Sequence, residues 1–261
     1  MALSPLPPFW AGYLMVLTAL LGLVMGSALH CLSWRIAREE GWGSGRSRCA
    51  ACGHTLGPGE LIPLVSWLLQ KGRCRHCGAP ISWRYPASEL TLAVVYVSLL
   101  LRFGITLELA QNLVLCSCLF CLSIVDLDVQ LIPHRFLLIP ALVRLGLCAW
   151  QEGLTQTGIC LVRGAALGAV ILLLVMLLDK VLGKPSMGGG DIKLLAMLGL
   201  FFPLINWLLM VMLACVLGIA VALACGTKRG VAFPFGPAIA GAAWLTLLFG
   251  QEICSWYLGL F

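Results

Sequence analysis

Long runs of apolar residues recur along the whole chain, and they constrain its fold more than any other feature of the sequence. About 20 consecutive apolar residues form a helix that crosses the roughly 30 Å hydrocarbon core of a bilayer. Of the 261 residues, 61% are apolar and only 11% are charged, so a single soluble core would leave much apolar surface in water. The chain is therefore predicted to be an all-α, polytopic membrane protein.

The ends of the apolar runs, marked by Pro, Gly and charged residues, predict about eight transmembrane helices. The expected helices cover residues 9–33, 85–103, 109–127, 134–150, 161–182, 190–202, 204–226 and 234–258. No basic segment precedes the first run, so we expect a retained helix and not a cleaved signal peptide. This pattern divides the chain into a first helix (1–33), a polar loop (34–84) and a membrane core (85–261).

Basic residues are concentrated in alternate loops, and this asymmetry predicts the orientation of the chain, because short loops rich in Lys and Arg stay in the cytoplasm. These residues are Arg35, Arg38, Arg46, Arg48, Lys71, Arg73, Arg75, Arg84, Arg135, Lys180, Lys184, Lys193, Lys228 and Arg229. We expect an inner-membrane protein with both termini in the periplasm and the polar loop in the cytoplasm. The net charge of +6 reflects this bias, and no aromatic-interleaved basic face indicates nucleic-acid binding.

Four of the thirteen cysteines form two CxxC pairs in the polar loop: Cys49 with Cys52, and Cys74 with Cys77. Paired CxxC motifs at this spacing are typical of structural zinc sites. A cytoplasmic loop lies in a reducing compartment, which disfavours disulfides. We favour a structural Zn²⁺ held by four thiolates, with a redox-active thiol pair or unliganded cysteines as the alternatives. His54 and His76 lie beside the cysteines and could replace a thiolate, although four thiolates already complete a tetrahedral site.

Two aspartates lie at the ends of predicted membrane helices, where an ionisable residue is costly and indicates function. Asp126 lies near the end of helix 109–127, and Asp191 follows three glycines and opens helix 190–202. The predicted topology puts both at the cytoplasmic face. Two carboxyl groups that share a site split their pKa values, so that one acts as base and the other as acid in peptide hydrolysis. A helix N-terminus favours negative charge, so we expect Asp191 to be the more acidic member.

These motifs resemble the type IV prepilin peptidase family of GxGD aspartyl proteases. GGGDIK is similar to the family's GxGDxK signature and DLDVQLIP to its DxDxxxIP signature, and the paired CxxC motifs agree as well. The resemblance implies an endopeptidase that removes the leader of type IV prepilins or pseudopilins after a glycine, in a pilus or type II secretion system. It implies Asp126 and Asp191 as the catalytic pair. It also implies four zinc ligands, which are Cys49, Cys52, Cys74 and Cys77.

The resemblance further implies N-methylation of the new terminal residue with S-adenosylmethionine as the donor. The chain has no glycine-rich fingerprint for an adenosyl cofactor, so this activity rests on the resemblance alone. Glu89 is a candidate to orient the amine or the cofactor, or else to cap a backbone group or pair with a charge. The alternative functions are a leader peptidase without methyl transfer and a proton-coupled transporter. The expected partners are prepilin or pseudopilin substrates and the lipid bilayer, and the oligomeric state is left open.

Overall fold

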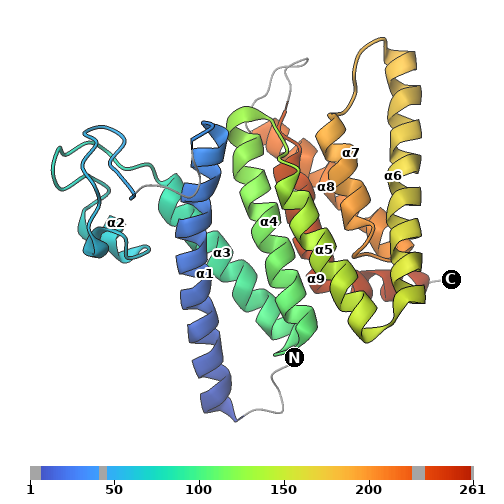
Figure 1. The fold of residues 1–261 in the computed structure, drawn as a ribbon, viewed down its shortest axis with the longest axis horizontal. Coiled ribbons are helices and arrows are strands. Elements are labelled where there is room, and N and C mark those ends of the chain that lie inside the picture. Colours follow the sequence, from blue (N-terminus) through green and yellow to red (C-terminus); the bar gives the residue numbers. More distant parts are fainter. Residues whose placement is uncertain (1–6, 41–45, 225–232, 260–261) are drawn as a thin grey trace. The chain divides into compact units, whose positions relative to one another are not determined.

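Helices make up the regular secondary structure of the computed structural model, which describes residues 7–40, 46–224 and 233–259 (Figure 1). The elements are α1 (Pro8–Ala37), η1 (Pro58–Glu60), α2 (Val65–Leu69), α3 (Arg84–Phe103), α4 (Leu107–Val129), α5 (Arg135–Gln151), α6 (Leu154–Leu182), α7 (Gly189–Leu198), α8 (Leu204–Ala224) and α9 (Gly236–Leu258). Across the described ranges, β-structure is limited to two isolated bridges. The all-α class is confirmed. The basic residues Lys228 and Arg229 lie outside the described residues.

Each of the eight predicted helices has a counterpart among the described residues. Six of these, α1, α3, α4, α6, α8 and α9, are long and apolar enough to cross a membrane. The 17-residue α5 contains Pro140, and α7 has only 10 residues, a length of about 15 Å. The polytopic membrane class is confirmed, and the number of eight crossings stays a prediction.

Residue contacts divide the chain into two units, Met1–Leu113 and Val114–Phe261. In the first unit, α1 packs along α3 at two glycines, and both glycines are buried. A Cβ atom added to Gly22 would lie 2.5 Å from Cα of Ala93, and one added to Gly26 would lie 2.7 Å from Cα of Glu89. Small residues let membrane helices approach until their backbones touch. These two positions therefore set the spacing between α1 and α3.

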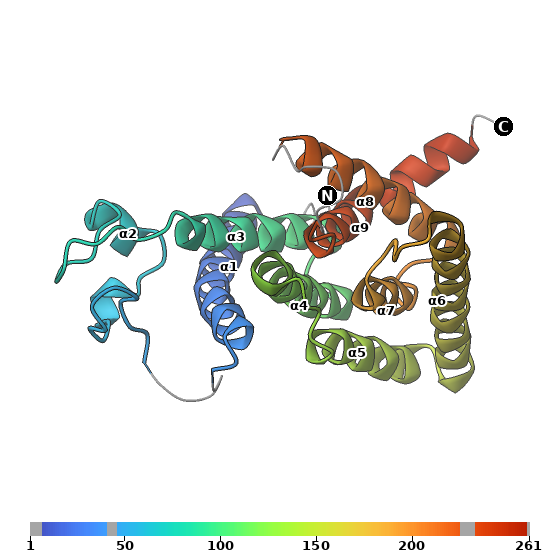
Figure 2. The same cartoon turned by 90° about the horizontal axis from the view of Figure 1, so that it is seen from above.

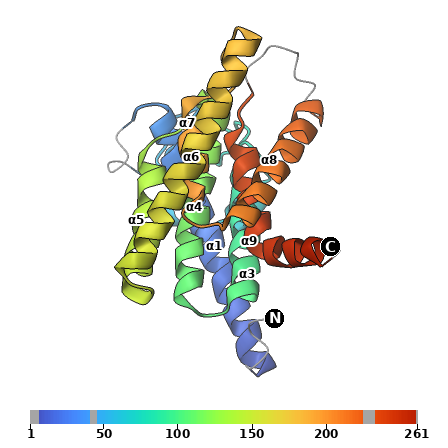
Figure 3. The same cartoon turned by 90° about the vertical axis from the view of Figure 1, so that its right-hand side faces the viewer.

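In the second unit, α7 packs against α6 and α5, and α8 pairs with α9 (Figures 2 and 3). Glycines again allow a close approach, because a Cβ atom added to Gly168 of α6 would lie 2.6 Å from Cβ of Ala196 in α7. A Cβ atom added to Gly164 would lie 3.1 Å from the Ala196 carbonyl oxygen. The short α7 is thus held directly against the backbone of the longer α6.

Side-chain donors also bind the carbonyl groups at the C-terminal end of α7. Arg163 of α6 donates to the oxygens of Gly199 and Leu200, both at 2.9 Å. The indole of Trp207 donates to the Leu195 oxygen at 3.0 Å. The last carbonyls of a helix have no partner within the helix, and a cation is favourable there. These bonds fix the position of α7, and with it the position of the aspartate at its other end.

We expect Gly22→Ala and Gly12→Ala to change stability in opposite directions, although both glycines lie in α1. The new methyl group at Gly22 would clash with the α3 backbone, and overpacking of this kind costs about 1–3 kcal/mol. Gly12 has open space around its Cβ position, so alanine there should stabilise the helix by about 0.5–1 kcal/mol. Thermal unfolding of the detergent-solubilised protein measures both. Equal effects from the two substitutions would contradict the glycine contact.

Candidate functional site

Asp126 lies in the last turn of α4, and its side chain is only 5% exposed. Its Oδ2 accepts a hydrogen bond of 2.8 Å from the backbone N–H of Gly236, the first residue of α9. The first N–H groups of a helix have no partner within the helix, so they readily bind a carboxylate. A Cβ atom at position 236 would lie 2.8 Å from this oxygen, so the close approach requires glycine. Sequence reasoning missed Gly236, which is 110 residues from its partner.

Asp191 lies in the first turn of α7 and directly follows Gly188, Gly189 and Gly190 in the sequence. Its carboxylate accepts a hydrogen bond from the backbone N–H of Gly188. A Cβ atom at Gly190 would lie 2.9 Å from Cβ of Ile132, which belongs to the DLDVQLIP segment after α4. The third glycine therefore brings the two sequence motifs into direct contact.

The two carboxyl groups influence each other electrostatically. Two carboxyl groups that share a site do not both ionise easily, so a negative charge on Asp126 disfavours a second one on Asp191. The Oδ1 atom of Asp191 is buried and has no hydrogen-bond partner among the described residues, whereas Asp126 has an amide donor that favours an ionised oxygen. The structure thus favours Asp191 as the protonated member. This is the reverse of the expectation from helix dipoles, which left burial out.

An apolar cavity of about 390 Å³ lies between residues of α4, α8 and the start of α9. Its lining consists of Leu127, Leu217, Val221, Phe233, Pro234, Pro237 and Ala238. Leu127 directly follows Asp126, and Pro237 directly follows the glycine that binds it. Sequence neighbours of both partners in the Asp126–Gly236 hydrogen bond therefore line this cavity. Asp128, two positions further along α4, is exposed to solvent.

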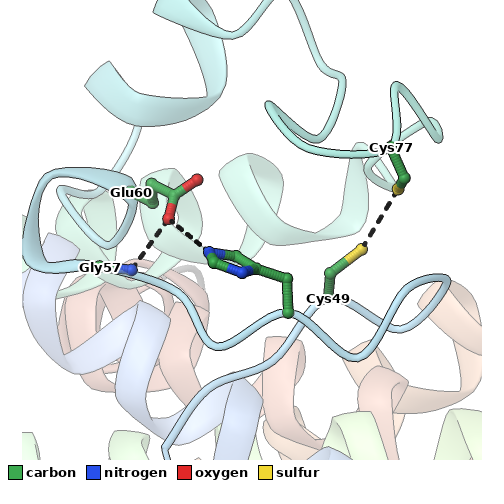
Figure 4. Close-up of polar contacts among 5 residues, drawn as sticks. Cys49, Gly57, Glu60 and Cys77 are labelled. Carbon is green, nitrogen blue, oxygen red and sulfur yellow. Dashed lines mark hydrogen bonds and ion pairs between the residues drawn. The ribbon is translucent and has the colours of Figure 1, made fainter.

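The four predicted ligand cysteines come together in the polar loop. Their Sγ atoms all lie within 4.8 Å of one another, and those of Cys49 and Cys77 are 3.9 Å apart (Figure 4). A tetrahedral zinc ion with bonds of about 2.3 Å holds its sulfurs about 3.8 Å apart, so the geometry fits such an ion. This cluster could hold a metal ion.

The two cysteine pairs lie on turns of the same construction. In the first, the Gly53 N–H donates to the Cys49 oxygen; in the second, the Gly78 N–H donates to the Cys74 oxygen. Both glycines have a left-handed φ, 72° and 70°, which favours glycine. The isolated bridges lie at these turns, between Arg48 and Thr55 and between Arg73 and Pro80. The paired turns present the four sulfurs to one centre.

Glu89 of α3 is buried, and its Oε2 accepts the N–H of Leu64 at 2.7 Å. Leu64 has an uncommon left-handed φ of 58° and precedes the first residue of α2. Of the roles considered for Glu89, the structure supports the capping of a backbone group. This bond attaches the polar loop to the membrane helix α3.

Comparisons with known proteins relate most of the chain to one family. Residues 20–103 match the Bacterial Peptidase A24 N-terminal domain, and residues 113–223 match the Type IV leader peptidase family. A protein named prepilin leader peptidase/N-methyltransferase from Bacillus subtilis (strain 168) is 34% identical over 91% of this chain and 95% of its own length. Proteins of the same name from Pseudomonas aeruginosa and Dichelobacter nodosus are 36% and 39% identical, over 92% and 79% of this chain and 92% and 72% of their own lengths. No solved structure matches the chain.

Proposed function

The chain belongs to the type IV leader peptidase family, and from this premise we propose that it is a membrane-embedded aspartyl endopeptidase with Asp126 and Asp191 as its catalytic pair. Its substrates are type IV prepilins or pseudopilins, and its relatives bear the name prepilin leader peptidase/N-methyltransferase. The observation that carries the assignment is the close contact of the two family motifs at Gly190 and Ile132, near two carboxyl groups with different hydrogen-bond environments among the described residues.

In the proposed reaction, ionised Asp126 takes a proton from a water molecule as that water attacks the scissile carbonyl carbon. Protonated Asp191 donates to the carbonyl oxygen, which gives a tetrahedral intermediate. The C–N bond then breaks, the amine leaves with the proton held by Asp126, and Asp191 recovers its proton. The Gly236 N–H keeps the Asp126 carboxylate in place and favours its ionised state at the start of the cycle.

The protein is a multi-pass inner-membrane protein, as the family and its apolar helices indicate. We place both termini in the periplasm and the loop and the aspartates on the cytoplasmic side, because the basic residues follow that pattern. The chain is then divided into a first helix (1–33), a cytoplasmic loop (34–84) and the protease core (85–261). A substrate keeps its basic leader in the cytoplasm while its apolar helix approaches from the bilayer. The apolar cavity next to Asp126 suits an apolar side chain at the cut.

For the cysteine cluster we propose a structural Zn²⁺ held by Cys49, Cys52, Cys74 and Cys77. Four thiolates complete a tetrahedral coordination shell and leave no position for a reactive water, so the ion would act as a cross-link in the loop. Methyl transfer from S-adenosylmethionine to the new amino terminus is supported by the names of the relatives. Glu89 helps to position the loop through its bond to Leu64.

The central test is leader cleavage by Asp126→Asn and Asp191→Asn. Each substitution removes one proton-transfer group at nearly constant shape, so each should slow cleavage by about 10²–10⁴-fold. The assay follows the shortening of a purified prepilin in detergent, with the melting temperature of each variant as a check on folding. Asp128→Asn is the control and should cleave at the parental rate. Full cleavage by either catalytic variant would refute the assignment of that residue.

Methyl transfer is tested separately with labelled S-adenosylmethionine. The parent protein should cleave the prepilin and transfer label to the mature amino terminus. Asp191→Asn should fail to label intact prepilin, yet it should label a pre-cleaved substrate, because methylation does not need the proton transfers of peptide hydrolysis. Cleavage by the parent protein without any transfer of label would remove the methyltransferase half of the proposal.

A further inference from the structure

The short helix α2 of the polar loop has its apolar side exposed. Leu68 and Leu69 follow Val65 by three and four residues, so the three side chains lie on one face, and all three are exposed. Ser66 is buried, and the indole N–H of Trp67 donates to a backbone oxygen of the loop at 3.3 Å. A surface helix of a water-soluble unit normally buries its apolar face. Helix α2 has the reverse arrangement, which indicates a surface that contacts an apolar partner.

The exposed apolar side chains continue on the N-terminal side of α2. Together they form the apolar patch, which consists of Leu61, Ile62, Val65, Leu68 and Leu69. A further exposed aromatic side chain, Trp83, directly precedes α3 and is 72% exposed. Tryptophan is enriched where a membrane helix meets the lipid headgroups, because its ring is amphipathic.

A hydrogen bond holds the start of α2 close to the end of a membrane helix. The Leu64 N–H, directly before α2, donates to Oε2 of Glu89 at 2.7 Å. Glu89 is the sixth residue of α3, about 8 Å along the axis from the first, and α3 is long and apolar enough to cross a membrane. The apolar patch therefore begins at the level where α3 enters the bilayer.

The charge of this part of the chain indicates which partner fits the patch. Between residues 46 and 84 there is one acidic residue, Glu60, against six basic ones. The basic residues are all exposed: Arg46, Arg48, Lys71, Arg73, Arg75 and Arg84. Anionic headgroups attract such side chains, while apolar side chains beside them enter the boundary between headgroups and acyl chains.

We propose that the polar loop docks onto the membrane surface, with the apolar patch in the headgroup region and anionic lipid phosphates bound by the basic side chains. Two other occupants fit the charge less well. A prepilin with a basic leader would be repelled by the loop, and a second copy of the chain would present the same excess of positive charge. The proposal concerns the loop alone and does not depend on the catalytic pair.

The test measures hydrogen exchange of the full-length protein in two kinds of nanodisc, one of phosphatidylcholine alone and one containing phosphatidylglycerol as well. Without substrate, the amides of residues 61–69 should exchange about tenfold more slowly in the anionic discs, because several basic residues favour the docked state there. About 1 M NaCl should remove most of this difference, since it screens charges beyond a few ångströms.

Matched variants separate the two contributions. Leu68→Ser combined with Leu69→Ser should abolish the slow exchange in anionic discs. Lys71→Gln combined with Arg73→Gln should weaken it severalfold. Lys180→Gln combined with Lys184→Gln removes the same charge from exposed positions outside the loop and should leave it unchanged. Unaltered exchange of the buried residues 99–100 in α3 shows that a variant is folded.

Three results would overturn the proposal. The first is equal exchange of residues 61–69 in both kinds of disc for the parent protein, a comparison that requires no variant. The second is slow exchange that appears only after a prepilin is added, which would make the patch a substrate surface. The third is slow exchange only in discs that hold two copies of the chain, which would make it an interface between protomers.

Discussion

A bilayer offers no hydrogen-bond partner to a backbone, and the rest of this structure depends on that constraint. Every peptide group at membrane depth must be satisfied within the protein, which favours helices. The backbone groups in the middle of a helix form hydrogen bonds with one another. The first N–H groups and the last C=O groups have no partner within the helix. The polar side chains of the second unit bind at these ends. Asp126 binds the N-terminal N–H of α9, and Arg163 and Trp207 bind the C-terminal carbonyls around the end of α7.

The same constraint explains where the chemistry lies. A carboxylate in hydrocarbon must find a donor, and a helix N-terminus supplies one without a second charge. Asp126 uses this donor, whereas Oδ1 of Asp191 has no hydrogen-bond partner among the residues that the structure describes. The two aspartates are therefore chemically different because their surroundings differ, and this difference is what acid and base roles require. Gly236 lets the backbone of α9 come close to the Asp126 carboxylate, and Gly190 lets the start of α7 come close to Ile132.

Much of this could be predicted from the sequence, and the failures have identifiable physical causes. Helix positions were predictable because the apolar runs and their Pro, Gly and charged ends are local features of the sequence. The short α7 was predicted too long, to residue 202, since apolar residues continue past its end. Helix dipoles were a poor guide to the acidity of Asp191, because burial depends on residues distant in the chain. Gly236 and the apolar cavity were missed for the same reason. The cysteine pairs were recognised because their spacing alone carries the signal.

The polar loop follows a different principle from the membrane helices. Small folded units with little buried apolar surface need cross-links, and metal ions supply them in reducing compartments, where disulfides do not persist. In the described part of the loop, large apolar side chains such as Leu68, Leu69 and Trp83 are exposed, so they add little to its stability. Its fixed points are the cysteine turns, the Gly57 bond to Glu60 and the Leu64 bond to Glu89. An ion held by the cysteine cluster would therefore support the folding of the loop, whereas the contacts described for α6 and α7 involve glycine packing and backbone hydrogen bonds.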